Sequence, residues 1–140
     1  MIFKVEIKDS VPFCRNMETD QGWKLVRDAE IRNGAFSVQP RPLLVSGEER
    51  IEFEEVLRRK GKQGLFGQKH AEAILAKVTE LPPEWQKFHI LFPDTVWKGF
   101  FSNTFDSIAG LHMLYPGVWE LYFRWVGHGF TSCDYILDTV

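Results

Sequence analysis

The chain has 140 residues, of which 44% are hydrophobic and 26% are charged, and its formal net charge is −2. This composition is that of a globular protein rather than a disordered one, and the length fits one domain over residues 1–140 that needs neither a disulfide nor a metal to be stable. The near-neutral charge argues against a dedicated binder of duplex DNA, because such binding needs many clustered cations.

The chain also lacks the marks of export and of membrane insertion. No uncharged apolar run approaches the roughly 20 residues of a membrane span, and the first residues alternate charged with apolar side chains instead of forming a signal peptide. Cys14 and Cys133 form no CxxC pair and no disulfide framework, so we expect reduced thiols. These features predict a cytoplasmic protein with no membrane partner.

The first predicted elements are strands. Residues 2–8 alternate apolar and charged side chains, which indicates a strand with one buried face. Asn33-Gly34 is the strongest hairpin signal, and a two-residue turn there places Ile31 opposite Phe36. Pro40 and Pro42 then predict that the second arm ends or lies at a sheet edge.

Two helices are expected in the middle of the chain. Ser46 to Glu49 fits a capping box, so the first helix is expected to begin at Glu48 or Glu52 and to end near Lys60. The second is predicted from Gly67 to Glu80, because its apolar residues recur at helical spacing and two prolines follow it.

The C-terminal third predicts an aromatic hairpin. Residues 119–125 alternate in character, and a turn at 127–129 would pair them with 131–137, with Cys133 on the apolar face opposite Phe123. Residues 103–114 are read as a helix, with a pair of strands joined at Pro116-Gly117 as the open alternative. The expected fold is α+β, with an antiparallel, aromatic-rich sheet packed against two or three helices.

A basic, glycine-containing cluster follows the first predicted helix. Its candidate anion-binding or nucleic-acid-binding residues are Arg58, Arg59, Lys60, Lys62, Gly64 and Lys69. Glycines let backbone N–H groups approach an anion, but the spacing is not that of a Walker A loop. Gly61-Lys62-Gln63-Gly64 between two helices resembles the GXXG loop of a KH domain, which implies a grip on the backbone of single-stranded nucleic acid. The alternative is a solvated helix end whose cations complement the helix dipole.

Catalytic and metal signatures are weak. The four histidines show no metal-ligand spacing, and we expect no metal and no cofactor. His128 is expected to be exposed, and His112 to be hydrogen-bonded near the core. The predicted burial of Cys133 argues against a nucleophilic pair with His128. Pro93-Asp94 is read as a turn, and four aspartates remain open as a carboxylate group: Asp94, Asp106, Asp134 and Asp138.

The predicted outer face of the C-terminal hairpin carries four candidate partner-binding residues, which are Tyr122, Arg124, Phe130 and Ile136. Tyrosine and arginine are enriched in binding hot spots, and exposed apolar patches mark contact surfaces. The competing interpretation is a second core layer that covers this face.

We therefore expect a non-enzymatic binding or regulatory protein with a protein partner, such as a small inhibitor, immunity protein or phage accessory protein. A homodimer is compatible with this expectation. The alternatives are a binder of single-stranded nucleic acid or a phosphate ligand through residues 58–69, and a small hydrolase or transferase with a dispersed carboxylate and histidine site.

Overall fold

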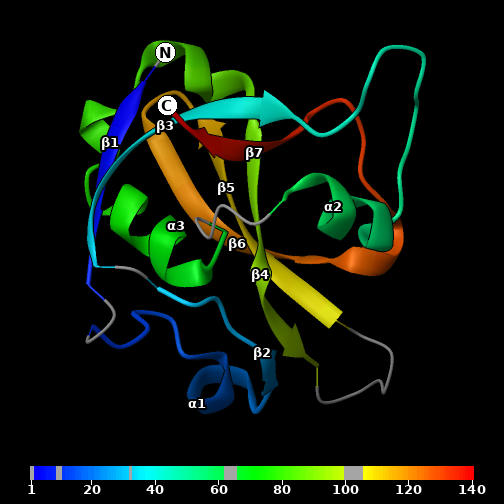
Figure 1. The fold of residues 1–140 in the computed structure, drawn as a ribbon. Coiled ribbons are helices and arrows are strands. Elements are labelled where there is room, and N and C mark those ends of the chain that lie inside the picture. The colour runs from blue at the N-terminus through cyan, green and yellow to red at the C-terminus, as the bar shows by residue number, and fades with distance from the viewer. Residues whose placement is uncertain (1, 9–10, 32, 62–65, 100–105) are drawn as a thin grey trace.

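A computed structural model describes residues 2–8, 11–31, 33–61, 66–99 and 106–140 (Figure 1). These residues form a mixed α+β fold with a curled sheet of seven strands and three α-helices. The strands are β1 (Phe3–Ile7), β2 (Lys24–Arg27), β3 (Gly34–Pro42), β4 (His89–Lys98), β5 (Asp106–Tyr115), β6 (Val118–Trp125) and β7 (Asp134–Thr139). The helices are α1 (Met17–Gln21), α2 (Phe53–Arg59) and α3 (Gln68–Leu75), with short 3-10 helices η1 (Val78–Glu80), η2 (Pro83–Lys87) and η3 (Val126–His128).

The sheet is mixed rather than antiparallel. Its strand order is β1-β3-β7-β4-β5-β6, and β2 pairs with the end of β4. β4 and β7 run parallel, with His89 opposite Asp134, because the chain crosses from β6 to the far side of β4. The expected α+β class and helix number are confirmed, and the expected purely antiparallel pairing is wrong.

The N-terminal strand is confirmed, but the hairpin at Asn33-Gly34 is not. In β1, Phe3, Val5 and Ile7 are buried while the residues between them are exposed. Phe36 faces Val5 of β1, and Ile31 lies outside the strands. β3 therefore pairs with two strands distant in the sequence, and these contacts override the local turn signal.

The prolines of β3 lie on a locally unpaired side, as the sequence predicts. The Ser37 carbonyl accepts a hydrogen bond from Val140 N at 2.9 Å, so odd-numbered residues of β3 direct their backbone groups towards β7. Pro40 and Pro42 therefore direct their nitrogens to the opposite side, where the pairing with β1 has already ended at Val38. Neither proline removes a hydrogen bond from the sheet.

The two central helices lie where they are expected, with shorter bounds. α2 begins only at Phe53, because the proposed capping box is not formed and Glu48 instead accepts a hydrogen bond from Val45 N. α3 begins directly after Gly67 and ends at Leu75, and η1 then continues to Glu80. Ala71 and Ile74 are fully buried, as the helical spacing predicts.

The C-terminal third differs most from the expectation. Residues 106–115 form strand β5 instead of a helix, and residues 103–105 lie outside the described part of the chain. Gly117, with φ of 82°, turns the chain into β6, so β6 pairs with β5 rather than with β7. Ile108 and Ala109 point to opposite faces that are both buried, and such a run carries no clear period in the sequence.

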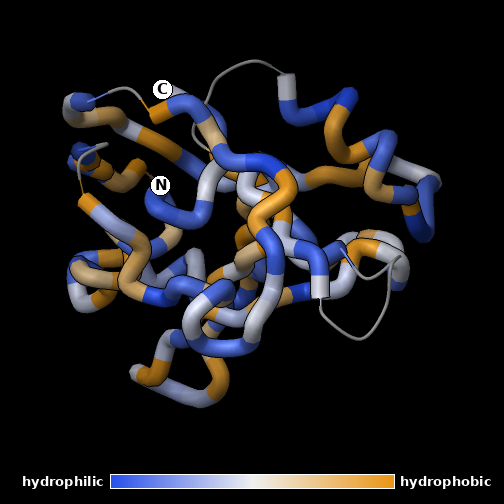
Figure 2. The backbone as a smooth tube through the Cα atoms, turned by 90° about the horizontal axis from the view of Figure 1, so that it is seen from below, coloured by the Kyte–Doolittle hydropathy of each residue, from blue (hydrophilic) through white to orange (hydrophobic). Residues whose placement is uncertain are grey.

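Two hydrophobic cores occupy the two faces of the sheet. α3 contributes Ala71 and Ile74 to the first core, and α2 contributes Val56 to the second. β4 supplies both, since Ile90 belongs to the first core and Leu91 to the second. Figure 2 shows hydrophobic and hydrophilic stretches alternating over short distances along the chain. None of the helices in the described residues is long and apolar enough to cross a membrane.

Candidate functional site

The cations at residues 58–60 of the predicted anion-binding cluster are each held by a carboxylate of the same chain. Arg58 bonds Glu55, and Lys60 Nζ lies 2.9 Å from Asp94 Oδ1. Arg59 donates to both carboxylate oxygens of Glu48 at 2.6 Å and to the Leu43 carbonyl. The Arg59 guanidinium lowers the pKa of the Glu48 carboxyl to about 2 through this hydrogen bond.

The remaining cluster residues are not brought to the same place. Lys62 and Gly64 lie outside the described residues. Lys69 belongs to α3, and its ammonium group lies 5.1 Å from the centre of the Phe13 ring. The structure thus separates Lys69 from the cations at the end of α2.

The four predicted partner-binding residues divide into two buried and two half-buried ones. Phe130 and Ile136 are fully buried in the second core, so the expectation that they point outward is wrong. The physical reason is that α2 and its flanking segment cover this part of the face as a second layer, and β7 leaves β6 to pair with β3 and β4.

Tyr122 lies flat across its neighbour on β5. A Cβ atom built on Gly110 would be 2.6 Å from the Tyr122 ring, so only glycine at this position lets the ring lie there. Burial raises the pKa of the Tyr122 hydroxyl to about 12, and the Arg124 guanidinium partly opposes this rise.

Arg124 is held in place by three contacts. It forms an ion pair with Asp134, whose side chain is almost fully buried, and donates a hydrogen bond of 2.7 Å to the Gly129 carbonyl. Its guanidinium also lies 4.7 Å from the centre of the Phe130 ring. The positive charge is therefore balanced by a neighbouring carboxylate.

An open hollow of about 490 Å³ lies at the end of β6. Its lining combines the two half-buried predicted residues with further aromatic and polar side chains, which are Trp23, Ser107, Tyr122, Phe123, Arg124, Trp125 and His128. We call it the aromatic hollow.

Close ring contacts shape the aromatic hollow. Trp23 meets Phe123 edge to face with ring centres 5.7 Å apart, and Trp125 meets His128 in the same way at 4.4 Å. A Cβ atom on Gly127 would be 2.6 Å from the Trp125 ring, so this glycine provides the space for the indole. The walls are thus formed by packing within the chain, which favours a preformed site.

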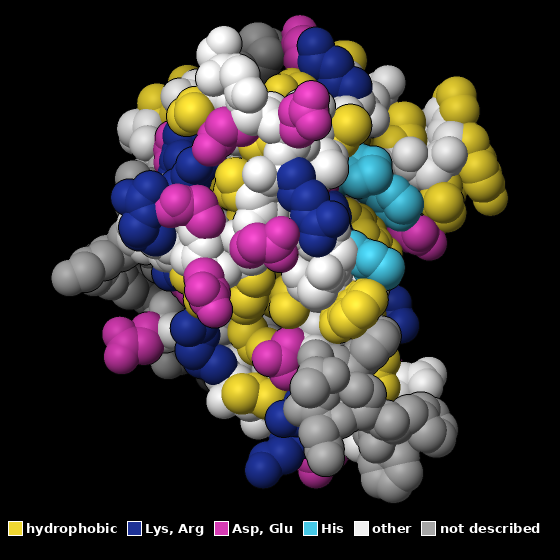
Figure 3. All heavy atoms as spheres, turned by 90° about the vertical axis from the view of Figure 1, so that its right-hand side faces the viewer, with side chains coloured by type: hydrophobic (Ala, Val, Ile, Leu, Met, Phe, Trp, Pro, Cys, Tyr) yellow, Lys and Arg dark blue, Asp and Glu magenta, His cyan; other side chains and the backbone are white. Residues whose placement is uncertain are grey.

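A row of titratable side chains crosses four strands beside this hollow. Asp134 lies opposite His89, the His89 and His112 rings are 5.2 Å apart, and His112 Nε2 lies 2.7 Å from Glu120 Oε1. Burial and the neighbouring His112 lower the pKa of His89. His70 is buried, whereas other histidine side chains reach the surface on the face that Figure 3 shows. The expected hydrogen bonding of His112 and exposure of His128 are confirmed.

The remaining catalytic candidates are placed apart. Cys133 is exposed, so its expected burial is wrong. Asp94 lies within β4 rather than in a turn, where its backbone N–H bonds the Phe66 carbonyl. Asp138 pairs with Arg41 and Asp134 with Arg124, so these aspartates do not form one group. Within the described ranges, no cluster of three or more His, Cys, Asp or Glu residues could hold a metal ion.

Sequence reasoning missed part of the hollow. Trp23 comes from a distant segment beside α1, and its only signal is a large aromatic residue before a short strand. A scan against models of known protein families finds no match, and searches of curated proteins and of solved structures find none either.

Proposed function

We propose that this protein is a non-enzymatic binding or regulatory protein that recognises a protein partner through the aromatic hollow. The observation that carries the proposal is the meeting of Trp23, Tyr122, Arg124 and Trp125 around one open hollow of about 490 Å³. Tryptophan, tyrosine and arginine are the residue types enriched at binding hot spots. The volume also lies within the range of about 300–1,000 Å³ that is usual for ligand sites.

The charge of the hollow favours an uncharged occupant. Arg124 is paired with the buried Asp134, so its guanidinium offers little attraction to a phosphate or carboxylate. The aromatic walls suit a bulky apolar side chain that a partner inserts, as anchor residues do at the centre of an interface. A small inhibitor, immunity protein or phage accessory protein would use such a surface.

A peptide-display selection tests the proposal. A random library of peptides would be selected on the immobilised protein, and selected peptides would be measured by fluorescence polarisation. We expect peptides that share an aromatic anchor, with affinities that fall about tenfold or more in Trp23→Leu, because this change removes one wall of the hollow.

The matched control is Trp119→Leu, which replaces another half-buried tryptophan that lies on β6 outside the hollow. Its affinities should stay close to those of the unchanged protein. Equal losses in both variants, or peptides that bind Trp23→Leu normally, would rule out the aromatic hollow as the contact site.

A small hydrolase or transferase is the alternative that one observation favours, namely the row from Asp134 through His89 and His112 to Glu120. Two adjacent imidazoles of which one is oriented by a carboxylate can act as a general acid and base. Turnover of chromogenic esters or phosphates that is lost in both His89→Gln and His112→Gln would support it. The nucleic-acid alternative has less support, because the described cations at residues 58–60 are paired.

A further inference from the structure

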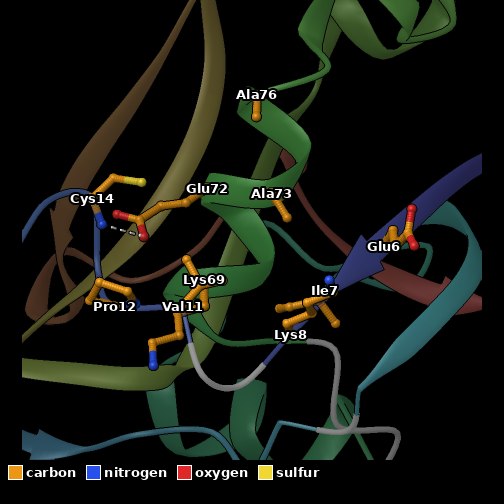
Figure 4. A pocket seen from close by; sticks show the side chains of 10 residues that line it. All are labelled: Glu6, Ile7, Lys8, Val11, Pro12, Cys14, Lys69, Glu72, Ala73 and Ala76. Carbon is orange, nitrogen blue, oxygen red and sulfur yellow. Dashed lines mark hydrogen bonds between the residues drawn. The ribbon is translucent and has the colours of Figure 1, made fainter.

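A second candidate site lies along α3, and it shares no lining residue with the aromatic hollow (Figure 4). Two adjoining hollows of about 180 and 210 Å³ share Cys14, Glu72 and Ala76, and we call them together the α3 groove. The first hollow lies between α3 and β1, and the second lies between α3 and Leu121 of β6.

Small side chains on the helix leave the first hollow open. Ala73 and Ala76 extend only one carbon from α3 and its end, and Ala73 lies on the side of the helix towards Ile7 of β1 (Figure 4). Val11, which is 49% exposed, and Pro12 form the other side. The resulting surface is mostly apolar, and it is preserved only while residue 76 stays small.

Side chains of α3 fix one wall of the groove without any ligand. Glu72 accepts hydrogen bonds from Cys14 N at 2.9 Å and from Arg15 N at 2.8 Å. Gln68 donates a bond of 2.7 Å to the Arg15 carbonyl. The wall is thus preformed, so a ligand would not have to order it on binding.

The opposite wall offers backbone hydrogen-bonding groups. β1 is the first strand of the sheet order, and Lys4 lies opposite Ser37, which uses its backbone groups towards β7. Lys4 and Glu6 therefore direct their N–H and C=O groups away from β3, to the side of β1 on which no strand of the described residues pairs. A peptide main chain in the groove can bond to such groups.

The charges near β1 favour a carboxylate. Glu72 is nearly buried and its two oxygens accept hydrogen bonds, so it contributes little repulsion. The Glu6 carboxylate points away from α3 in Figure 4. Three glutamates and four lysines line this hollow and the adjoining one along β1, and the lysines are Lys4, Lys8, Lys69 and Lys77. The lining of this side therefore has a formal excess of one positive charge, although the whole chain has a net charge of −2.

The size of the first hollow limits the occupant. Its volume of about 180 Å³ is below the usual range of whole-ligand sites and close to that of an apolar cavity of about 150 Å³ that holds benzene. It therefore suits one apolar side chain. In an extended peptide the neighbouring side chains point to the opposite face, so an adjacent Asp or Glu would point away from the groove. A C-terminal carboxylate, by contrast, is attached to the residue that fills the hollow.

We propose that the first hollow of the α3 groove binds the C-terminal residue of a partner protein, with its aliphatic side chain between Ala76 and Ile7 and its carboxylate near Lys8. The probe is the fluorescein-labelled peptide Gly-Ser-Gly-Ser-Gly-Ser-Leu with a free C-terminal carboxylate, measured by fluorescence polarisation. Its C-terminal amide should bind about tenfold more weakly.

Two variants locate the binding. Ala76→Leu fills the hollow from an exposed position and should weaken binding of the acid about tenfold. Lys8→Glu should weaken it about fivefold, with the effect reduced at high salt. The control Lys24→Glu makes the same charge change on β2, outside the groove, and should leave the affinity unchanged. Melting temperatures check that each variant is folded.

Several outcomes would overturn the proposal. Equal binding of the acid and the amide would show that the C-terminal carboxylate is not recognised. Normal binding by Ala76→Leu would show that the peptide does not occupy the first hollow. If a peptide with an internal Leu-Glu pair and an amidated end is bound as well as the acid is, the site does not recognise the C-terminal residue as such. Absence of binding up to about 1 mM peptide would also reject it. These outcomes are separate from the test of the aromatic hollow, because Ala76 and Lys8 do not line that hollow and Trp23 does not line the α3 groove.

Discussion

The first and last strands in the sheet order, β1 and β6, differ in how the rest of the chain covers their outer edges. At β6, Arg15 donates a hydrogen bond of 3.2 Å to the Leu121 carbonyl, and its guanidinium lies 5.2 Å from the centre of the Phe123 ring. At β1, the backbone groups of Lys4 and Glu6 point away from β3, and Glu6 lines the α3 groove. Proteins usually protect their edges from foreign strands. The contrast between the covered edge of β6 and the edge of β1 agrees with the proposal that β1 takes part in binding.

The largest expected effect comes from Glu72, because it supports both regions at once. Its carboxylate holds the segment that carries Arg15 to β6 and forms the wall of the groove beside β1. Glu72→Ala leaves two backbone N–H groups without this acceptor and should lower the free energy of unfolding by about 3 kcal/mol. Denaturant unfolding measures this loss, and amide hydrogen exchange should become faster at Cys14 and Arg15. Glu18→Ala on exposed α1 is the control, and similar losses in both would contradict the assigned role.

The pH dependence of stability should report on the same helix. Burial lowers the pKa of His70 on α3 from 6.5 to about 4. Between these values the unfolded chain binds a proton that the folded chain does not, so stability falls as the pH drops through this window. The shift corresponds to at most about 3 kcal/mol.

Unfolding free energies at pH 7 and at about pH 4.5 would show this loss. His70→Gln should reduce the difference between the two, whereas His128→Gln, at an exposed site, should not. An unchanged pH dependence in His70→Gln would contradict the burial argument.

A smaller loss of stability is expected from a change in β5, the strand that pairs with β6. Gly110→Ala places a methyl group where the Tyr122 ring lies, so the ring must move and stability should fall by about 2 kcal/mol. The double variant with Tyr122→Ala should lose less than the sum of the two single changes. Additive losses would mean that the two residues act separately. The near-ultraviolet circular dichroism spectrum reports the movement of the ring.

The smallest effect on stability should come from Arg15 itself, although it sharpens the comparison most directly. Arg15→Ala should cost about 1 kcal/mol and uncover the β6 edge. Two β6 strands paired antiparallel about Tyr122 would place Glu120 opposite Arg124 of the second copy, which is a favourable arrangement. Sedimentation equilibrium should therefore show increased self-association in Arg15→Ala. The control Arg27→Ala, elsewhere on the surface, should leave self-association unchanged. A purely monomeric Arg15→Ala would show that other groups protect the edge of β6.

The sequence was most informative where one periodic pattern decided the structure. The alternation of β1 and the helical spacing around Ala71 and Ile74 both predict what is observed. Patterns failed where both faces are buried, as at Ile108 and Ala109, because no period remains. They also failed at Asn33-Gly34, where pairing with β1 and β7 prevails over a local turn.

The candidate sites were less predictable than the fold. Tyr122 and Arg124 were identified from their alternation on one strand, but the burial of Phe130 depended on which strands pair. Trp23 and the wall at Cys14 come from distant segments, and their positions depend on bonds such as those to Glu72. No local spacing encodes such contacts.

The prolines of β3 also limit where a strand from another copy of the chain can add to the sheet. Beyond Val38, the outer side of this strand offers only carbonyl groups at Pro40 and Pro42, because their nitrogens carry no hydrogen. A strand from another molecule that aligned there would lose every second hydrogen bond of the ladder. The sheet therefore cannot be extended by stacking of copies along this stretch, and any fibril seeded by the chain would have to begin elsewhere.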